Sequence, residues 1–232
     1  MLRVMNSKTI SAVPVLTAAG IILLLCACTT APATQAPPPI DPYAVYKENR
    51  PRSILVMPPV NRSPDIMAQA AFLATSTVPL AESGYYVIPV TVSQEMFRQN
   101  GVTIAEEAHA ISFDRLHEIF GADAALYITV SRYGVRFVVV DSIVEAEAAA
   151  RLVDLRSGLV LWSGRTRTEL KGYNSNNGNL LSSIIGAALD QISNTLSDRA
   201  YDAGKTANYK LLSAGNKDSV LYGPYHPKFE TD

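Results

Sequence analysis

The chain has 232 residues, of which 48% are hydrophobic and 18% are charged, and its formal net charge is −1 at pH 7. A chain of this length and composition can form one globular core of ordinary size. Its basic residues are scattered singly, whereas binding to nucleic acid requires a basic excess or a basic stripe. We therefore expect no nucleic-acid partner.

The first 27 residues predict a secretory signal peptide. Arg3 and Lys8 supply positive charge, the first acidic residue is Asp41, and a mostly apolar run extends from Val13 to Ala27. Export signals have this order of charged and apolar regions. The run is shorter than the roughly 20 residues that a helix needs to cross a bilayer. Residues 1–27 are therefore expected to be removed on export.

The predicted signal ends in Leu25-Cys26-Ala27-Cys28, which resembles the lipobox of bacterial lipoproteins. In that motif an aliphatic residue precedes the lipid-bearing cysteine by three positions, with small residues between them. Cys28 fits this pattern, whereas lipid on Cys26 would place Leu25 where the motif has a small residue. The resemblance predicts lipid attachment at Cys28. The alternative is ordinary cleavage near Ala27 with two incidental cysteines.

Lipid on Cys28 determines where the mature chain resides and which chemistry it lacks. Two or three acyl chains hold a protein firmly on a membrane. Thr29 follows the cysteine, and in the sorting pattern of lipoproteins an aspartate there signals retention in the inner membrane, so we expect the periplasmic face of the outer membrane. No free thiol remains for a disulfide, a nucleophile or a zinc site. Loss of Arg3 and Lys8 leaves 18 basic and 21 acidic residues, a net charge of −3.

The mature chain divides into a tether, one domain and a tail. Residues 28–52 are rich in Ala, Thr and Pro, a composition that does not form a core. We therefore predict a lipidated tether over 28–52, a single α/β domain over 53–225 and a tail over 226–232.

The domain begins with the pattern of a strand, a helix and a second strand. Ser53–Val60 is an almost continuous apolar run, typical of a strand buried on both faces. A helix is predicted over Pro64–Glu82, with Ser63 as its N-cap and Gly84 at its end. Tyr85–Val90 predicts a second strand, which makes a parallel, right-handed crossover the expected connection. Two further helices are expected at Val92–Asn100 and Phe113–Phe120.

An antiparallel region follows this parallel start. Ala124–Tyr133 alternates as a strand does, and two alternating runs between Ile143 and Leu170 flank a predicted three-residue loop, Arg156-Ser157-Gly158. The expected register pairs Glu147 with Arg167, Leu152 with Trp162, and Val153 with Leu161. The predicted apolar face comprises Val144, Ala146, Ala148, Leu152, Val160 and Trp162.

Leu180–Ala200 has the spacing of a long amphipathic helix. Docking of this helix on the sheet is favoured over membrane contact or an oligomer interface. The predicted fold class is α/β, a mixed sheet with a parallel βαβ start and an antiparallel C-terminal hairpin, with helices packed on the sheet.

The turn after the first strand is the candidate partner or ligand surface. It contains Asn61, Arg62, Ser63 and Asp65, and ligands of parallel sheets gather at the carboxyl ends of strands. The competing interpretation of this turn is a capped helix start.

No catalytic, cofactor or metal site is predicted. The three histidines, at positions 109, 117 and 226, have none of the common metal-binding spacings, and the serine-hydrolase and nucleotide-binding motifs are absent.

Five segments together resemble a family of predicted bacterial lipoproteins that is described as a domain of unknown function. They are RPRSILVMPPVNRSPD, ESGYYVIPV, GADAALYITV, LVDLRSGLVLWSG and YGPYHP. The resemblance implies a fold similar to the N-terminal domain of TolB and to the periplasmic part of the curli-secretion lipoprotein. It also implies association with a curli-secretion-like lipoprotein, because such genes are found in clusters together. The family has no established catalytic residues to carry over.

These observations favour a non-enzymatic, membrane-anchored periplasmic lipoprotein that acts through protein partners in envelope assembly or secretion. One alternative is an envelope hydrolase, which would place His117 or Asp65 beside a hydroxyl group in a compact pocket. Another is a small-ligand or glycan binder, which would have a deep pocket lined by aromatic residues. No cofactor is expected, and the sequence leaves the oligomeric state open.

Overall fold

The computed structural model describes residues 41–138, 141–171 and 187–231. These residues lie in one compact unit that begins at Asp41. The predicted signal, Cys28 and residues 29–40 of the predicted tether lie outside the described residues. Within the described residues, no helix combines the length and the apolar character that a membrane span requires.

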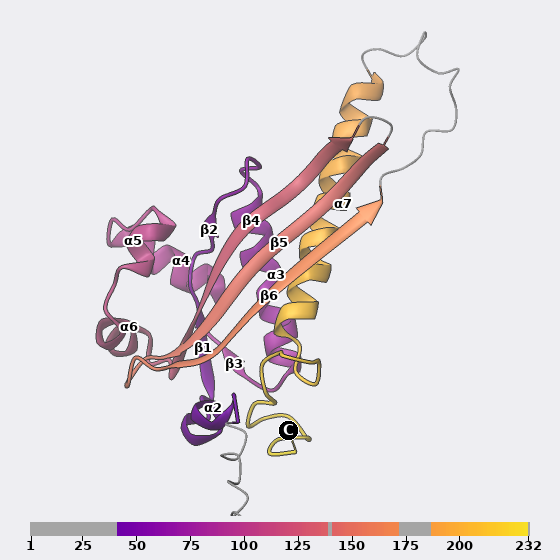
Figure 1. Cartoon of the computed structure of the whole chain (residues 1–232). Helices are drawn as coiled ribbons and strands as arrows, with labels where there is room; N and C mark the ends of the chain where they lie inside the picture. The colour runs from indigo at the N-terminus through magenta and orange to yellow at the C-terminus, as the bar shows by residue number, and fades with distance from the viewer. Residues whose placement is uncertain (1–40, 139–140, 172–186, 232) are drawn as a thin grey trace, which may run out of the picture. The chain divides into compact units, whose positions relative to one another are not determined.

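A mixed sheet forms the centre of the unit (Figure 1). Its strand order is β3-β1-β4-β5-β6. Strand β2 pairs with the same edge of β4 as β1 does, farther along β4. The short strands β1, β2 and β3 run parallel to their neighbours, whereas β4, β5 and β6 are antiparallel. This arrangement confirms the predicted fold class. The strands are β1 (Ser53–Val56), β2 (Val60–Asn61), β3 (Tyr86–Val87), β4 (Ala124–Val138), β5 (Asp141–Asp154) and β6 (Val160–Lys171).

Helices pack on both faces of this sheet. The larger core joins one face of the sheet to α3, to the C-terminal part of α7 and to α2, whereas the smaller core joins the other face to α4, α5 and α6. The helices are α2 (Ala44–Asn49), α3 (Ala68–Glu82), α4 (Val90–Gln99), α5 (Ala105–His109), α6 (Phe113–Phe120) and α7 (Ala187–Leu212). Figure 1 shows α3 and α7 behind the long strands and α4 to α6 beside their lower part.

The apolar run Ser53–Val60, which was predicted as one strand, forms the two short strands β1 and β2. Pro58 and Pro59 have no N–H group for the ladder, so pairing is interrupted after Val56. The Met57 N–H still donates to the Leu126 carbonyl at 3.0 Å. Pairing with β4 resumes at Val60, opposite Thr129.

Several predicted helix boundaries were wrong. Helix α3 begins at Ala68 instead of Pro64, because the preceding residues form a turn. The predicted C-terminal helix continues past Ala200 to Leu212, and its expected start at Leu180 lies outside the described residues. Beyond Ala200, the side of α7 that faces the core includes Ala203 and Ala207, small residues that carry little periodic signal. The contacts of α7 with β5 and β6 confirm that its described part docks on the sheet.

The hairpin register was predicted correctly except near the loop. Glu147 pairs with Arg167 and Leu152 with Trp162, but a bulge after Leu152 pairs Val153 with Val160 instead of Leu161. Val160, predicted to be inward, is therefore exposed, and Leu161 is buried.

The loop of this hairpin is longer than the three residues that were expected. The Asp154 carboxylate accepts the N–H groups of Arg156 at 3.1 Å and Ser157 at 2.7 Å. Gly158, at φ +71°, has the expected left-handed conformation.

The predicted tether boundary at residue 52 was also wrong, because α2 belongs to the folded unit. Tyr46 is 2% exposed, and its hydroxyl lies 2.7 Å from that of Tyr85, which donates to the Leu221 carbonyl at 2.6 Å. The Arg50 guanidinium lies over the Phe229 ring, 5.0 Å from its centroid. The C-terminal segment thus clamps α2 against the body of the fold.

A buried amide joins α3 to α7. The Asn208 side chain is fully buried, and its Nδ2 donates to the Phe72 carbonyl at 2.9 Å and to Thr75 Oγ1 at 2.6 Å. Both acceptors belong to α3, so this one side chain ties the two helices of the larger core together.

We expect Asn208→Ala to lower the free energy of unfolding by about 1–3 kcal/mol, because it removes these buried hydrogen bonds. Urea unfolding of the purified full-length protein measures the loss. The control is Lys205→Ala, an exposed change on the same helix that should alter stability by no more than about 0.5 kcal/mol. Equal losses in the two variants would contradict a specific role for the amide.

Candidate functional site

The structure brings the predicted site residues together in one turn after β2. Asn61 organises this turn: its Nδ2 donates to the Asp65 carbonyl at 2.8 Å, and its Oδ1 accepts the Ser63 N–H at 2.9 Å and the Ser63 hydroxyl at 2.7 Å. The Asp65 carboxylate accepts the Met67 N–H at 2.9 Å. Because these polar groups bond to one another and to the backbone, they hold the turn in shape.

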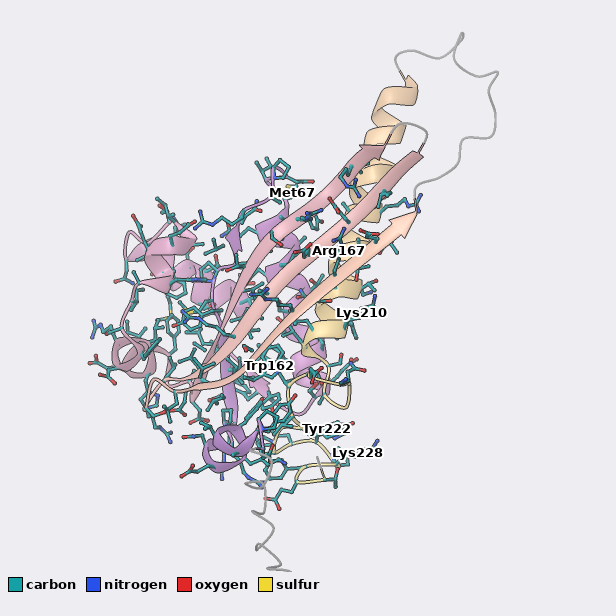
Figure 2. All side chains as sticks on the ribbon, viewed as in Figure 1. Met67, Trp162, Arg167, Lys210, Tyr222 and Lys228 are labelled. Carbon is teal, nitrogen blue, oxygen red and sulfur yellow. The ribbon has the colours of Figure 1, made fainter. Side chains whose placement is uncertain are left out.

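The interpretation of Ser63 as the N-cap of the helix is not correct. The N-cap of α3 is Met67, which makes no side-chain capping bond. The turn instead presents two apolar side chains to solvent: Ile66 is 87% exposed and Met67 is 59% exposed. Figure 2 shows Met67 at the projecting end of this turn. We call Ile66 and Met67 the apolar tip.

The turn is also held against its neighbours. The Arg62 guanidinium lies 3.4 Å from the Glu106 carboxylate on α5, and both side chains are largely exposed. On the other side, Asp65 approaches β4 at Gly134, where an added Cβ would lie 3.1 Å from Asp65 Oδ2 and where φ is +105°. Glycine at this position therefore permits the close approach of the turn to β4.

A second polar surface lies on the face of β4, β5 and β6 opposite α7. The Glu145 side chain, only 10% exposed, lies between three guanidinium groups, with distances of 3.5 Å to Arg132, 3.4 Å to Arg136 and 3.8 Å to Arg167. Glu147 bridges Arg132 at 3.4 Å and Arg167 at 3.9 Å. The opposite charges on this face neutralise one another, as is typical of a solvated sheet face.

The histidines make structural contacts. His117 Nδ1 lies 2.7 Å from the Ala122 carbonyl, and His109 Nε2 lies 2.8 Å from the Pro58 carbonyl. Burial lowers the pKa of His109, which the hydrogen bond to Pro58 only partly opposes. Burial also raises the pKa of Tyr127, the ring against which His109 packs, to about 12. In the part of the chain that the structure describes, no three His, Cys, Asp or Glu residues form a metal-binding group.

An aromatic cavity lies where α2 meets the C-terminal segment. Its lining includes Tyr46, Tyr85, Tyr222 and Phe229, and its volume is about 20 Å³. A cavity of this size has room for about one water molecule. A sugar ring or a larger small molecule does not fit into it.

A larger hollow lies between α3 and α4. This groove has a volume of about 690 Å³ and is open to solvent. Its apolar lining includes Leu73, Val90 and Val102, and its charged lining residues among the described ones are Glu95 and Arg98, which form an ion pair with each other at 2.6 Å. Sequence reasoning missed both this groove and the apolar tip. The available signal was the absence of charge from Ile66 to Ala81.

Comparison with known proteins identifies relatives over most of the chain. The family described as "Putative lipoprotein GNA1162-like" matches residues 41–225. "Putative lipoprotein NMB1124/NMB1162" of Neisseria meningitidis serogroup B is 44% identical over 211 residues, which are 91% of this chain and 95% of the relative.

Solved structures include a close relative. The crystal structure of lipoprotein GNA1162 from Neisseria meningitidis is 48% identical, with a TM-score of 0.52, over 62% of this chain and 99% of that chain. PelC from Paraburkholderia phytofirmans is more distant, with 13% identity and a TM-score of 0.38 over 69% of this chain and 86% of that chain. The family match and the 44% identical relative confirm the resemblance to a family of predicted lipoproteins. The chain belongs to the GNA1162-like family of putative lipoproteins.

Proposed function

We propose that this protein is anchored by lipid on Cys28 at the periplasmic face of the outer membrane and binds protein partners in envelope assembly or secretion. Residues 1–27 are the removed signal, and residues 28–40 are the tether. The observation that carries the partner-binding role is the apolar tip. Ile66 and Met67 are held out by a turn whose polar side chains are already bonded.

A rigid apolar tip is suited to binding a protein surface. Exposed apolar groups gain free energy when a partner covers them, and a preformed turn loses little conformational entropy on binding. The flanking Arg62 and Glu106 supply a polar rim of both signs. An envelope protein with an apolar pocket and a polar edge would fit this surface, and a curli-secretion-like lipoprotein is one such candidate.

The position of the tip also suits a partner in the periplasm. The folded unit begins beside α2, and Met67 lies away from α2, at the turn before α3 (Figures 1 and 2). Residues 28–40 reach about 40 Å if fully in polyproline II, at roughly 3.1 Å per residue. The tip can therefore meet a partner well away from the anchoring membrane.

A non-enzymatic role agrees with the contacts of the residues that would serve a hydrolase. The His117 ring is bonded to a backbone carbonyl, and the Asp65 carboxylate is bonded to a backbone N–H group. The names of the relatives describe lipoproteins and state no activity.

We expect Cys28→Ala to release the protein from the membrane fraction, because the acyl chains then have no attachment atom. Cys26→Ala is the matched control and should stay bound, since this residue leaves with the signal. Fractionation of cells followed by immunoblotting and by intact-mass analysis measures both. Equal membrane retention of the Cys28→Ala variant and the wild type would overturn the lipid assignment.

A photo-crosslinking amino acid at position 66 should capture an envelope protein reproducibly in intact cells, because Ile66 is the most exposed part of the tip. Mass spectrometry identifies the product. The same probe at Ser163, an exposed position on β6, is the control for chance capture. Adding Met67→Asp to the position-66 probe should reduce capture severalfold, since the charge disrupts an apolar contact. Capture at position 66 no greater than at Ser163 would contradict the proposal.

A further inference from the structure

Two arginines on the open face of β4, β5 and β6 have no carboxylate partner within the described residues. The ion pairs of this face are all made by three other arginines, Arg132, Arg136 and Arg167. Arg151 and Arg165 are exposed on the same face, and neither forms an ion pair with a described side chain. The charge of these two guanidinium groups is therefore left uncompensated.

The two unpaired arginines are neighbours on the sheet. Arg165 on β6 lies opposite Ala149 on β5, and Arg151 follows Ala149 by two residues, on the same face of β5. Diagonal neighbours of this kind are roughly 7–8 Å apart, so long side chains at both positions can reach one anionic group. The Arg151 guanidinium lies 4.8 Å from the centre of the ring of Tyr127, which is 3% exposed. We call Arg151 and Arg165 the arginine pair.

Arg165 also lies on the edge strand of the sheet. Strand β6 ends the strand order, and within the described residues no backbone group bonds to its outer edge. Every second residue of an edge strand directs its N–H and C=O groups away from the sheet, where another strand can pair with them. Strand β6 has 12 residues and contains no proline, so its own backbone does not prevent such pairing.

We propose that the outer edge of β6 binds an extended, acidic segment of a partner protein as an added strand. The edge identifies the conformation of this segment, because a strand satisfies a row of N–H and C=O groups. The arginine pair identifies its side chains. A residue opposite Arg165 would have its Cβ atom about 4.5–5.5 Å from that of Arg165. A glutamate or aspartate there supplies the carboxylate that the described residues do not offer.

Other occupants match these features less well. Two β6 strands paired antiparallel about their middle would bring Arg165 of one copy opposite an arginine of the other, which disfavours a second copy. An anionic membrane offers no strand for the edge, and the clusters that bind such a surface contain about four to eight basic residues. A partner strand meets both requirements at one place, because it pairs with the edge and brings a carboxylate to the arginine pair.

Binding of two synthetic peptides to the purified full-length protein tests this proposal. One peptide alternates threonine and glutamate over about the length of β6, and the other alternates threonine and lysine. We expect the glutamate peptide to bind and to slow amide hydrogen exchange at alternate residues of β6, whereas the lysine peptide should do neither. Fluorescence anisotropy measures the binding, and hydrogen exchange resolved by residue locates it.

Charge reversal at Arg165 gives a result that misfolding cannot mimic. Arg165→Glu should weaken binding of the glutamate peptide severalfold, because like charges then meet, and should allow the lysine peptide to bind. Lys205→Glu is the matched control. It makes the same change of charge at an exposed position of α7, on the other side of the sheet, and should alter neither affinity severalfold.

The two peptides and the two variants separate the possible results. Preference for the glutamate peptide, protection of β6 from exchange, and reversal of this preference by Arg165→Glu together support the added strand. Binding without protection of β6, equal binding of the two peptides, or no binding overturns it.

A photo-crosslinking amino acid at Ser163 identifies the natural segment in intact cells, because Ser163 is exposed on the same face of β6, two residues before Arg165. We expect a product with an acidic segment of another protein and severalfold less of it in the Arg165→Glu chain. A product of twice the monomer mass, or none above that of the Arg165→Glu chain, overturns the proposed occupant.

This inference goes beyond the proposed function, because it concerns β6 and not the apolar tip at Ile66. The two are tested separately. The chance background for the probe at position 66 is measured at Ser163 in the Arg165→Glu chain, in which the added strand is not expected to bind. The proposed function therefore stands or fails on its own experiment.

Discussion

The pairing of β4 on both of its edges is the constraint on which the rest of the structure depends. One edge receives the parallel strands β1 and β2, and the other receives β5 along almost its whole length. Because β4 is longer than its parallel partners, its first part has a parallel neighbour on one edge and an antiparallel neighbour on the other. Its last part pairs with the antiparallel strand β5. Near the start of β4 helices cover both faces, whereas farther along the described helices cover only the face toward α3 and α7 (Figure 1).

This change in covering explains the distribution of side chains on the long strands. Ala125 and Tyr127 are buried beneath the smaller core, while Thr129 and Ser131, on the same face of β4, are exposed. Beyond the smaller core this face carries Glu145 among arginines. A carboxylate that is 10% exposed requires opposite charges nearby, and Arg132, Arg136 and Arg167 supply them from two neighbouring strands. Apolar side chains that meet solvent are spread over the surface, and Ile66 and Met67 at the turn before α3 are two of them. The apolar tip that is proposed to bind partners lies outside both cores.

The contacts that hold α2 against the fold fix the point at which the predicted tether joins the folded unit. Tyr46 is buried against Tyr85 and the C-terminal segment, so the chain between Cys28 and the fold is shorter than its composition suggests. A shorter tether restricts how far the folded unit can move from the membrane.

The sequence by itself determined the mixed sheet and most of the hairpin register, and it predicts the signal and the lipid position. These depend on local order or on side-chain alternation with a period of two, so that alternation and the position of the loop were enough to pair Glu147 with Arg167. Only the tertiary structure decided the long-range and directional features. Tyr46 is buried by residues far along the chain, and the burial of Ala203 and Ala207 extends α7 without a strong periodic pattern. The sequence indicated a turn after the first strand, which the structure contains, but it did not indicate the directions of the side chains in that turn. Hydrogen bonds turn Asn61 and Asp65 inward and leave Ile66 outward, and such directions depend on backbone geometry that residue types alone do not specify.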